Sequence, residues 1–503
     1  MKKFVVSLVI TLFGLGVSQA KKGAPVLIPA PGAENVNIDT RLSLLFDSEP
    51  VAGTSGMIRI FDAATDACID SIDMSVPAGP TMPTKLPKAP YAMRPYIYDQ
   101  PRHTNRTIKP GTPSGTAAPG SDEYQLNIIG GFTDAFHFYP VIVSGCKAEI
   151  YPHNNMLDYG KSYYVTVDPG VIVLGSKKNF RGINKKDGWH FTVRRDSPAS
   201  SQRRLVVAAD GSGDFNTVQG AMDWIPEFSP EKWTVYIKNG DYEELVYFRN
   251  KTNVTIEGES RDSVYIHYAN NEVFNPHPAD VSTNEWLGTF PSRRAPFMAD
   301  NCYDMIFRNF TVATTCRGQA EGLLIMGQRN IAENITIIGD GDALQANGSL
   351  YMENCRIDGG GDLILGRGPV FLKDCTLLAS GPFAYIRNGA ANHGDVLVDC
   401  TLIGKSPRAI LARTNGTYPH CEMVLIDCTL ENIPPQGWEG ADKGQHDYVR
   451  YWEYGSRNPD GTPVDMSRRA EGSLCLDSVR DAAIIRAYRD PFFVLGWKPS
   501  EIR

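Results

Sequence analysis

A short phrase built around one cysteine recurs in the C-terminal half of the chain and limits the folds that the chain can adopt. It reads LYMENCRIDG from residue 350, VFLKDCTLLA from 370, VLVDCTLIG from 396 and MVLIDCTLEN from 423. The cysteine or its equivalent falls at positions 310, 335, 355, 375, 400 and 428. Steps of this size are typical of a solenoid, in which each coil stacks on the one before it.

Each copy of the phrase predicts two short strands joined by a polar corner. Alternation of apolar and polar residues along the strands selects the side chains that should face the core. These are Met352, Leu372, Leu397 and Leu425 before the corner, and Cys355, Ile357, Cys375 and Leu377 after it, with Cys400 and Cys428 in the same stack. The expected fold class is all-β, with a right-handed parallel β-helix. An antiparallel β-sandwich is the alternative, but sandwiches lack a repeat of this kind.

The N-terminal third of the chain has a different texture. Residues 24–195 contain short alternating runs such as GMIRIFDAA and DGWHFTVR with turn residues between them, which predicts a β-sandwich. The segment resembles the Ig-like domains that precede catalytic domains in exported bacterial proteins. Residues 86–122, rich in Pro, Gly, Ser and Thr, are expected to form a long insertion. A linker over 196–204 would then lead into a β-helix domain over 205–503, and Cys68 and Cys146 are a candidate pair for a disulfide.

The start of the chain, MKKFVVSLVITLFGLGVSQA, combines two lysines, an apolar run and small residues at the end. This is the pattern of a cleavable secretory signal, and the run is short for a membrane span. A secreted or periplasmic location is therefore expected. The net charge of −7 argues against nucleic acid and anionic membrane surfaces as partners.

One carboxylate, Asp362 in GGGDLILG, interrupts a stretch that otherwise reads as core. Asp342 precedes it by the same step that separates position 335 from Cys355, which is one coil. The two acids should therefore share a column on adjacent coils, where each affects the pKa of the other. Gln319 falls one coil before this pair, and Arg387 and Arg413 fall on later coils. Ordinary solvated ion pairs are the alternative interpretation, but this many polar groups in one column favour a site.

Several stretches of the chain resemble the pectin methylesterases, which are carbohydrate esterases built on a right-handed β-helix. The resemblance begins at VVAADGSGDFNTVQGAMD (206) and NGDYEELVYF (239), continues through GQAEGL, GDAL, DLILG, LAR and QGWEG, and ends at YWEYGSRNPDGTPV (451) and PFFVLGW (491). It covers the whole C-terminal part. ADGSGDF followed by GDYEE is the most specific part of the pattern.

The resemblance implies a role for each residue of the column. Asp362, in DLILG where relatives have DFIFG, would be the nucleophile, and Asp342, in GDAL where relatives have QDTL, the proton donor and then the base. Gln319 would donate to the oxyanion. Arg413, in LARTN where relatives have LGRPW, would hold Asp362 ionised. The expected substrate is the methyl ester of galacturonan in pectin, with no cofactor, no metal, and a monomeric enzyme.

The sequence also departs from the family pattern. Gly341 stands where relatives carry a second oxyanion glutamine, and Leu365 and Asn415 replace aromatic residues. Arg387 and Tyr385 are candidates for substrate binding. Trp438 and Trp452 are further candidate platforms for sugar rings, although each of these aromatic residues is as easily explained by packing.

Two other functions stay open at this point. The departures fit a non-catalytic or altered polysaccharide-binding β-helix derived from such an enzyme, although a mere binder has no need for two adjacent acids. A lyase or glycosidase on the same fold is less consistent, since lyases gather several acids around calcium and only two are evident in this column. No GxSxG motif and no pair of histidines with zinc spacing is found.

Overall fold

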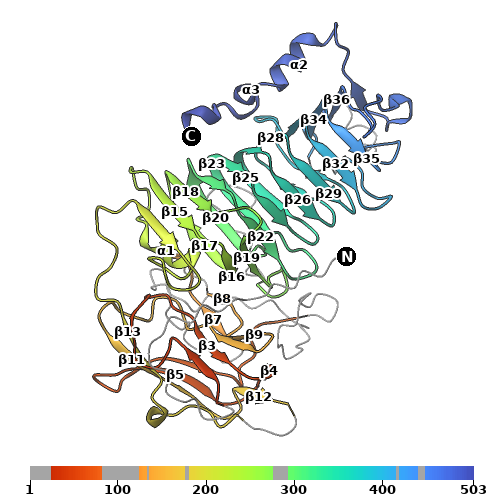
Figure 1. The fold of residues 1–503 in the computed structure, drawn as a ribbon. Coiled ribbons are helices and arrows are strands. Elements are labelled where there is room, and N and C mark those ends of the chain that lie inside the picture. The colour runs from red at the N-terminus through yellow and green to blue at the C-terminus, as the bar shows by residue number, and fades with distance from the viewer. Residues whose placement is uncertain are drawn as a thin grey trace.

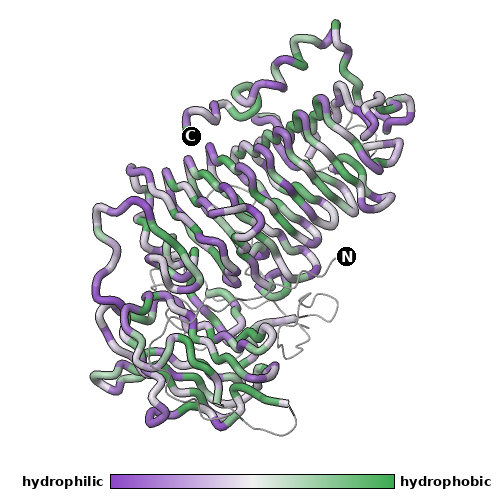
Figure 2. The backbone as a smooth tube through the Cα atoms, in the orientation of Figure 1, coloured by the Kyte–Doolittle hydropathy of each residue, from purple (hydrophilic) through white to green (hydrophobic). Residues whose placement is uncertain are grey.

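The computed structural model describes residues 24–81, 124–132, 135–175, 180–275, 293–414, 418–439 and 448–503. The expected secretory signal and the insertion at 86–122 lie outside these residues. Figure 1 shows a long solenoid of stacked strands with a smaller β-structure against one end. In Figure 2, apolar stretches follow the solenoid strands, while many of the turns between strands are hydrophilic.

Two sheets enclose one apolar core in the N-terminal part. The first has the order β1-β3-β10-β9 and is antiparallel; the second has the order β2-β13-β11-β5-β6, with one parallel pair. The first sheet consists of β1 (Val26–Ile28), β3 (Leu42–Leu45), β9 (Val141–Ser144) and β10 (Lys147–Ile150). The second consists of β2 (Ala33–Val36), β5 (Met57–Asp62), β6 (Cys68–Asp73), β11 (Ser162–Val167) and β13 (His190–Val193). Short pairs are made by β4 (Pro50–Ala52) with β12 (Ile172–Leu174) and by β7 (Leu126–Asn127) with β8 (Phe136–His137), and η2 (Lys185–Asp187) precedes β13.

The candidate disulfide between Cys68 and Cys146 is not present. Both side chains are free thiols. Cys68 opens β6 in the second sheet, whereas Cys146 lies in the turn between β9 and β10 of the first sheet. The two cysteines therefore belong to opposite layers.

The solenoid has three parallel sheets, so the β-helix expectation is confirmed. The back sheet contains β14 (Arg204–Val207), β15 (Trp233–Ile237), β18 (Val254–Gly258), β21 (Ile306–Arg308), β23 (Leu323–Glu333), β25 (Leu344–Glu353), β28 (Val370–Lys373), β31 (Asp395–Val398), β34 (Glu422–Ile426), β36 (Arg450–Tyr454) and β37 (Ser473–Cys475). The site sheet contains β17 (Val246–Arg249), β20 (Phe297–Tyr303), the first halves of β23 and β25, β27 (Ile364–Gly366), β30 (Ala384–Ile386) and β33 (Ala412–Arg413). The third sheet contains β16 (Gly240–Glu243), β19 (Val264–Tyr268), β22 (Thr311–Thr314), β24 (Thr336–Ile338), β26 (Arg356–Gly359), β29 (Thr376–Ala379), β32 (Thr401–Gly404) and β35 (Thr429–Glu431).

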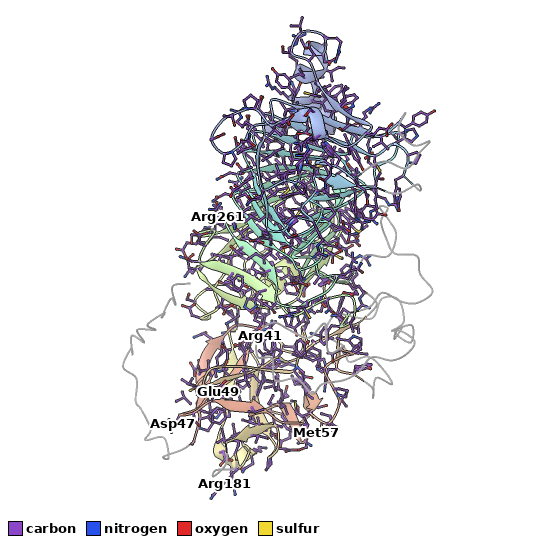
Figure 3. All side chains as sticks on the ribbon, turned by 90° about the vertical axis from the view of Figure 1, so that its right-hand side faces the viewer. Arg41, Asp47, Glu49, Met57, Arg181 and Arg261 are labelled. Carbon is purple, nitrogen blue, oxygen red and sulfur yellow. The ribbon has the colours of Figure 1, made fainter. Side chains whose placement is uncertain are left out.

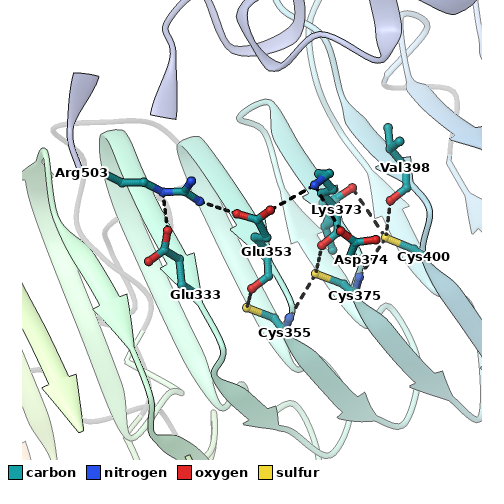
Figure 4. A network of polar contacts seen from close by, with 10 residues as sticks. Glu333, Glu353, Cys355, Lys373, Asp374, Cys375, Val398, Cys400 and Arg503 are labelled. Atoms are coloured by element: carbon teal, nitrogen blue, oxygen red, sulfur yellow. Dashed lines mark hydrogen bonds and ion pairs between the residues drawn. The ribbon is translucent and has the colours of Figure 1, made fainter. Parts of the chain in front are cut away.

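The cysteine phrase stacks as expected. Met352 pairs with Leu372 in register, and all the side chains predicted to face inward belong to one buried core. Cys355 donates its backbone N–H to Sγ of Cys375 at 3.4 Å, and Cys375 makes the same contact with Cys400 at 3.4 Å (Figure 4). The repeat is therefore the stacking unit of the core.

The polar corner has a conformational cause. Its Asn or Asp residue adopts the left-handed region in every copy, which these two residue types tolerate better than other residues with a Cβ. The residues are Asn309, Asn334, Asn354, Asp374, Asp399 and Asp427, with φ from 51° to 61°. Asn334 also donates to the Asn309 side chain at 2.9 Å and Asn354 to that of Asn334 at 3.2 Å, so the corners are linked from coil to coil.

Helices close the solenoid at its end and along its back. Helix α1 (Val218–Trp224) caps the first coil, and Asp39 of the N-terminal part accepts the backbone N–H of Thr217 at its start, at 2.8 Å. Helices α2 (Ala482–Tyr488) and α3 (Pro491–Leu495) run back over the outer face of the back sheet (Figure 1). Arg503 then bridges Glu333 and Glu353 (Figure 4). The short elements η3 (Met466–Arg468) and η4 (Pro499–Glu501) complete this segment.

The N-terminal part also covers the beginning of the site sheet. The outward side chains of its first three strands, Tyr247, Met298 and Leu324, are fully buried beneath aromatic residues of segment 129–151. Phe136, for example, lies 4.4 Å from Tyr247 between ring centroids. Arg41, labelled in Figure 3, marks the boundary between the two parts. Of the helices in the described ranges, none has the length and apolar character needed to cross a membrane.

Candidate active site

The candidate site begins on the site sheet where the N-terminal part ends. Leu324 pairs in register with Gln345, which is followed on successive coils by Leu365, Tyr385 and Arg413. These residues face outward, because the neighbouring ladder that runs from Leu323 to Ala412 lies in the core.

Asp342 and Asp362 occupy equivalent places on adjacent coils. Leu344 pairs with Ile364, and each acid lies two residues before its strand position. The one-coil step read from the sequence is therefore the register of the structure. Asp362 has a φ of 49°, a left-handed conformation that places it at the turn into β27.

Arg413 holds the Asp362 carboxylate with two hydrogen bonds. Its Nε donates to Oδ1 at 2.7 Å and its Nη2 donates to Oδ2. The guanidinium carbon lies 3.9 Å from the ring centroid of Tyr385, so the arginine is fixed between a carboxylate and an aromatic face. Two parallel bonds from a guanidinium fix the orientation of a carboxylate, and the Asp362 side chain retains 19% exposure, so the carboxylate is accessible.

Asp342 is in a different environment from Asp362. Its side chain is only 8% exposed. Burial, followed by repulsion from Glu321, raises the pKa of the Asp342 carboxyl to about 7. The charge of Asp362 acts in the same direction, whereas Arg294 and Arg387 act against it. The pair thus combines an arginine-bound carboxylate with an acid that holds its proton up to neutral pH.

Gln319 is connected to this pair through Arg294, which contacts both Gln319 and Asp342. The place expected for Gln319 in the column is taken by a neighbouring residue that was not predicted. The residue in register with Asp342 is Glu321, since Leu323 pairs with Leu344, and it is fully buried. Glu321 binds Arg294 through an ion pair. Extending the column backwards from Asp342 by one more coil would have found Glu321, but no pattern in the sequence indicates Arg294.

The remaining candidates divide into two groups. Arg387 follows β30, and both it and Tyr385 lie at the site, with the arginine 5.1 Å from the tyrosine ring centroid. Trp438 does not lie at the site. Its side chain is 1% exposed, stacks on Tyr451 with 4.8 Å between the ring centroids, and donates its indole N–H to Glu453.

The prediction that Trp452 forms a platform for a sugar ring is also wrong. Trp452 lies on β36 and packs against Tyr488 of α2 at 5.8 Å, on the outer face of the back sheet. The sequence shows that both tryptophans belong to late coils, but not to which side of the coil each side chain points. Asn415 lies outside the described residues.

The backbone at Gly341 has no space for the second glutamine of the family pattern. A Cβ at this position would lie 2.6 Å from the carbonyl oxygen of Gly318. Gly341 also donates its N–H to that oxygen at 2.8 Å. The backbone at Gly318 therefore lies directly against Gly341 and leaves no space for a side chain at position 341. Within the described ranges, no group of three or more His, Cys, Asp or Glu residues is arranged to hold a metal ion.

Comparisons with known proteins agree on one family. The family model described as Pectinesterase matches residues 204–471, just over half of the chain. Among curated proteins of Arabidopsis thaliana, probable pectinesterase 8 is 26% identical over 298 residues, 56% of this chain and 73% of that protein. Probable pectinesterase/pectinesterase inhibitor 42 is 34% identical over 141 residues, 28% of this chain and 25% of that protein. The chain spans between 25% and 30% of the length of this relative and the next two it matches.

Solved structures that resemble this one include two that are described as pectin methylesterases. A pectin methylesterase from carrot is 23% identical, with a TM-score of 0.49 over 60% of this chain and 96% of that one. A pectin methylesterase from Erwinia chrysanthemi is 19% identical, with a TM-score of 0.44 over 60% of this chain and 99% of that one. On the match of the family model, this chain belongs to the pectinesterase family.

Proposed function

We propose that this chain hydrolyses the methyl esters of galacturonan in pectin and releases methanol. The proposal depends on the difference in environment between two adjacent carboxyl groups. Asp362 accepts two hydrogen bonds from Arg413. Burial and neighbouring acids raise the pKa of the adjacent Asp342 to about 7. Two carboxyl groups in environments that separate their protonation are suited to a nucleophile and a proton donor.

The reaction follows from these two states. The Asp362 carboxylate attacks the carbonyl carbon of the ester, and the negative charge that develops on the carbonyl oxygen accepts a hydrogen bond from the Gln319 amide. As the tetrahedral adduct collapses, Asp342 gives its proton to the departing methoxide, which leaves as methanol. The sugar is then attached to Asp362 as a mixed anhydride.

Water completes the cycle. Asp342, now ionised, takes a proton from a water molecule that attacks the acyl carbon, and the anhydride breaks to return the Asp362 carboxylate. One ester and one water become one carboxylic acid and one methanol. Arg413 keeps Asp362 ionised at the beginning and the end of the cycle. Arg387 and Tyr385 are proposed to contact the sugar chain.

A methanol-release assay on pectins of differing methylation tests this function. We expect release by the wild-type chain and a fall of at least about 100-fold in Asp342→Asn, because the proton donor is lost. Asp358→Asn is the matched control: Asp358 is a carboxylate on β26 of the third sheet that binds Lys405 at 2.6 Å, and its loss should leave the rate unchanged. No release from any pectin by the wild-type chain, with pectin binding retained, would instead support the polysaccharide-binding alternative.

The organisation of the full chain is part of the same proposal. A secretory signal over 1–20, an Ig-like domain over 24–195, a linker over 196–204 and a pectinesterase-like domain over 205–503 would suit an exported monomeric enzyme acting on an extracellular polymer. The two sheets that enclose one core in the N-terminal part support the Ig-like assignment. N-terminal sequencing of protein recovered outside the cytoplasm should begin near residue 21.

A further inference from the structure

One guanidinium outside the family pattern touches several groups of the site at once. Arg294 binds the buried Glu321 through Nη2, and the same nitrogen lies 3.6 Å from Oδ2 of Asp342. Its Nη1 donates to Oε1 of Gln319 at 3.1 Å. We infer that Arg294, anchored by Glu321, is a positioning residue that fixes the Gln319 amide with its N–H groups turned toward the substrate. The inference rests on the proposed function.

The orientation follows from hydrogen-bond chemistry. A guanidinium has only donors, so the atom of Gln319 that faces Arg294 must be the amide oxygen. The amide nitrogen then points to the other side, where an oxyanion donor is needed. A cation bound to the oxygen also polarises the amide and makes its N–H groups stronger donors.

The need for such a device comes from the local backbone. Gly341 has no space for the second glutamine, so Gln319 is the remaining amide of the expected oxyanion pair. The Gln319 side chain is exposed, and an exposed glutamine samples many rotamers, so that holding it in one of them costs conformational entropy. A bond to a fixed guanidinium removes most of that freedom before the substrate arrives.

Burial of the anchor keeps the guanidinium in place. Glu321 is 0% exposed and the Arg294 side chain is 17% exposed. Burial alone would lower the pKa of Arg294, but the charges of Glu321, Asp342 and Glu272 outweigh it and raise the pKa, so the cation persists at every working pH. A carboxylate as deeply buried as that of Glu321 requires a charged partner. The strand register places Glu321 one coil before Asp342.

A double-mutant cycle in the methanol-release assay tests the inference. Arg294→Gln should lower kcat by about 10-fold to 100-fold with little change in KM, part of the loss that removing one oxyanion donor causes. In a Gln319→Ala background, the same substitution should cause no further loss in kcat. Arg308→Gln, which breaks an arginine pair with Glu333 on the back sheet, is the matched control and should have no effect in either background.

The pH profile gives a readout that misfolding would not imitate. Arg294 lowers the pKa of Asp342 and Glu321 raises it. Arg294→Gln should therefore move the alkaline limb of kcat/KM to higher pH, and Glu321→Gln should move it to lower pH. Arg294→Lys should keep the limb close to that of the wild type but still lose kcat, since one ammonium cannot form the same fork to Glu321 and Gln319.

The outcomes separate this inference from the proposed function. A wild-type chain that releases no methanol would overturn both. With an active wild-type chain, equal losses from Arg294→Gln in both backgrounds, or full activity in Arg294→Lys, would overturn the positioning role alone.

Discussion

One outward column of the site sheet has two different fates along its length. Its first members, Tyr247, Met298 and Leu324, are apolar or aromatic and lie beneath the N-terminal part. Its last members, Tyr385 and Arg413, lie uncovered beside the paired acids. The scaffold and the register are the same in both stretches. The parallel β-helix therefore supplies evenly spaced positions, and the side chains placed there decide between an interface and a site.

Apart from the two acids themselves, the residue whose loss should lower the rate most lies in the uncovered stretch. Arg413→Ala removes both bonds to Asp362 and leaves the nucleophile without the group that orients it, so methanol release should fall by about 100-fold or more. Arg356→Ala, which breaks a pair with Asp358 on the third sheet, is the control. Near-normal release in Arg413→Ala would mean that the uncovered stretch does not hold the nucleophile.

Substitutions in the covered stretch should lower the stability of the fold and leave the rate of methanol release nearly unchanged. Leu324→Ala leaves a cavity between the site sheet and segment 129–151, which should lower the free energy of unfolding by about 2 to 5 kcal/mol. Urea unfolding followed by fluorescence measures the loss. The kcat of the folded variant should stay within about twofold of the wild type. A large fall in kcat with unchanged stability would contradict the division between the stretches.

The acid in the uncovered stretch predicts a pH dependence. Proton donation requires protonated Asp342, whose pKa is raised to about 7 by burial and by Glu321, so kcat/KM should decline about tenfold per pH unit above pH 7. An alkaline limb that begins below pH 5 would show that Asp342 is not the donor.

The same acid should weaken the fold as the pH rises. The unfolded chain ionises at the ordinary aspartate pKa while the folded chain keeps its proton, so stability is lost between about pH 4 and pH 7. Asp342→Asn should therefore raise the melting temperature more at pH 8 than at pH 4. An equal change at both pH values would argue against a buried proton on Asp342.

The smallest expected effect concerns the ring beneath Arg413. Tyr385→Leu removes a cation–π contact worth about 0.5 to 1 kcal/mol, so kcat should fall by about twofold to fivefold. Tyr385→Phe keeps the ring and should retain the wild-type rate. Identical losses of kcat in the two variants would show that the hydroxyl of Tyr385, and not its ring, is responsible for the effect.

The solenoid could be predicted from the sequence because its strand pairing is local and repeated. Once the step from Cys355 to Cys375 is read, the register of every side chain on those coils follows, including that of Asp342 and Asp362. The corner residues gave an independent signal, because Asn and Asp are the residues that adopt the left-handed conformation found there.

The features that the sequence did not predict depend on contacts outside the repeat. Arg294 precedes β20 and reaches Gln319 across a coil, and no periodicity connects them. Trp452 lies on the back sheet and not at the site, and no pattern in the sequence shows to which sheet a strand of a late coil belongs. The burial of Leu324 depends on segment 129–151, which belongs to the other part of the molecule and is remote in the chain.

Methanol release by Asp362→Asn tests most sharply whether the two adjacent acids perform the chemistry. The asparagine has the same shape, can still accept from Arg413, and lacks the negative charge needed for attack. Assayed at pH 6 on highly methylated pectin, with circular dichroism to verify the fold, it should release no methanol above the blank while the wild-type chain does. Release at a rate near that of the wild-type chain would show that Asp362 is not the nucleophile.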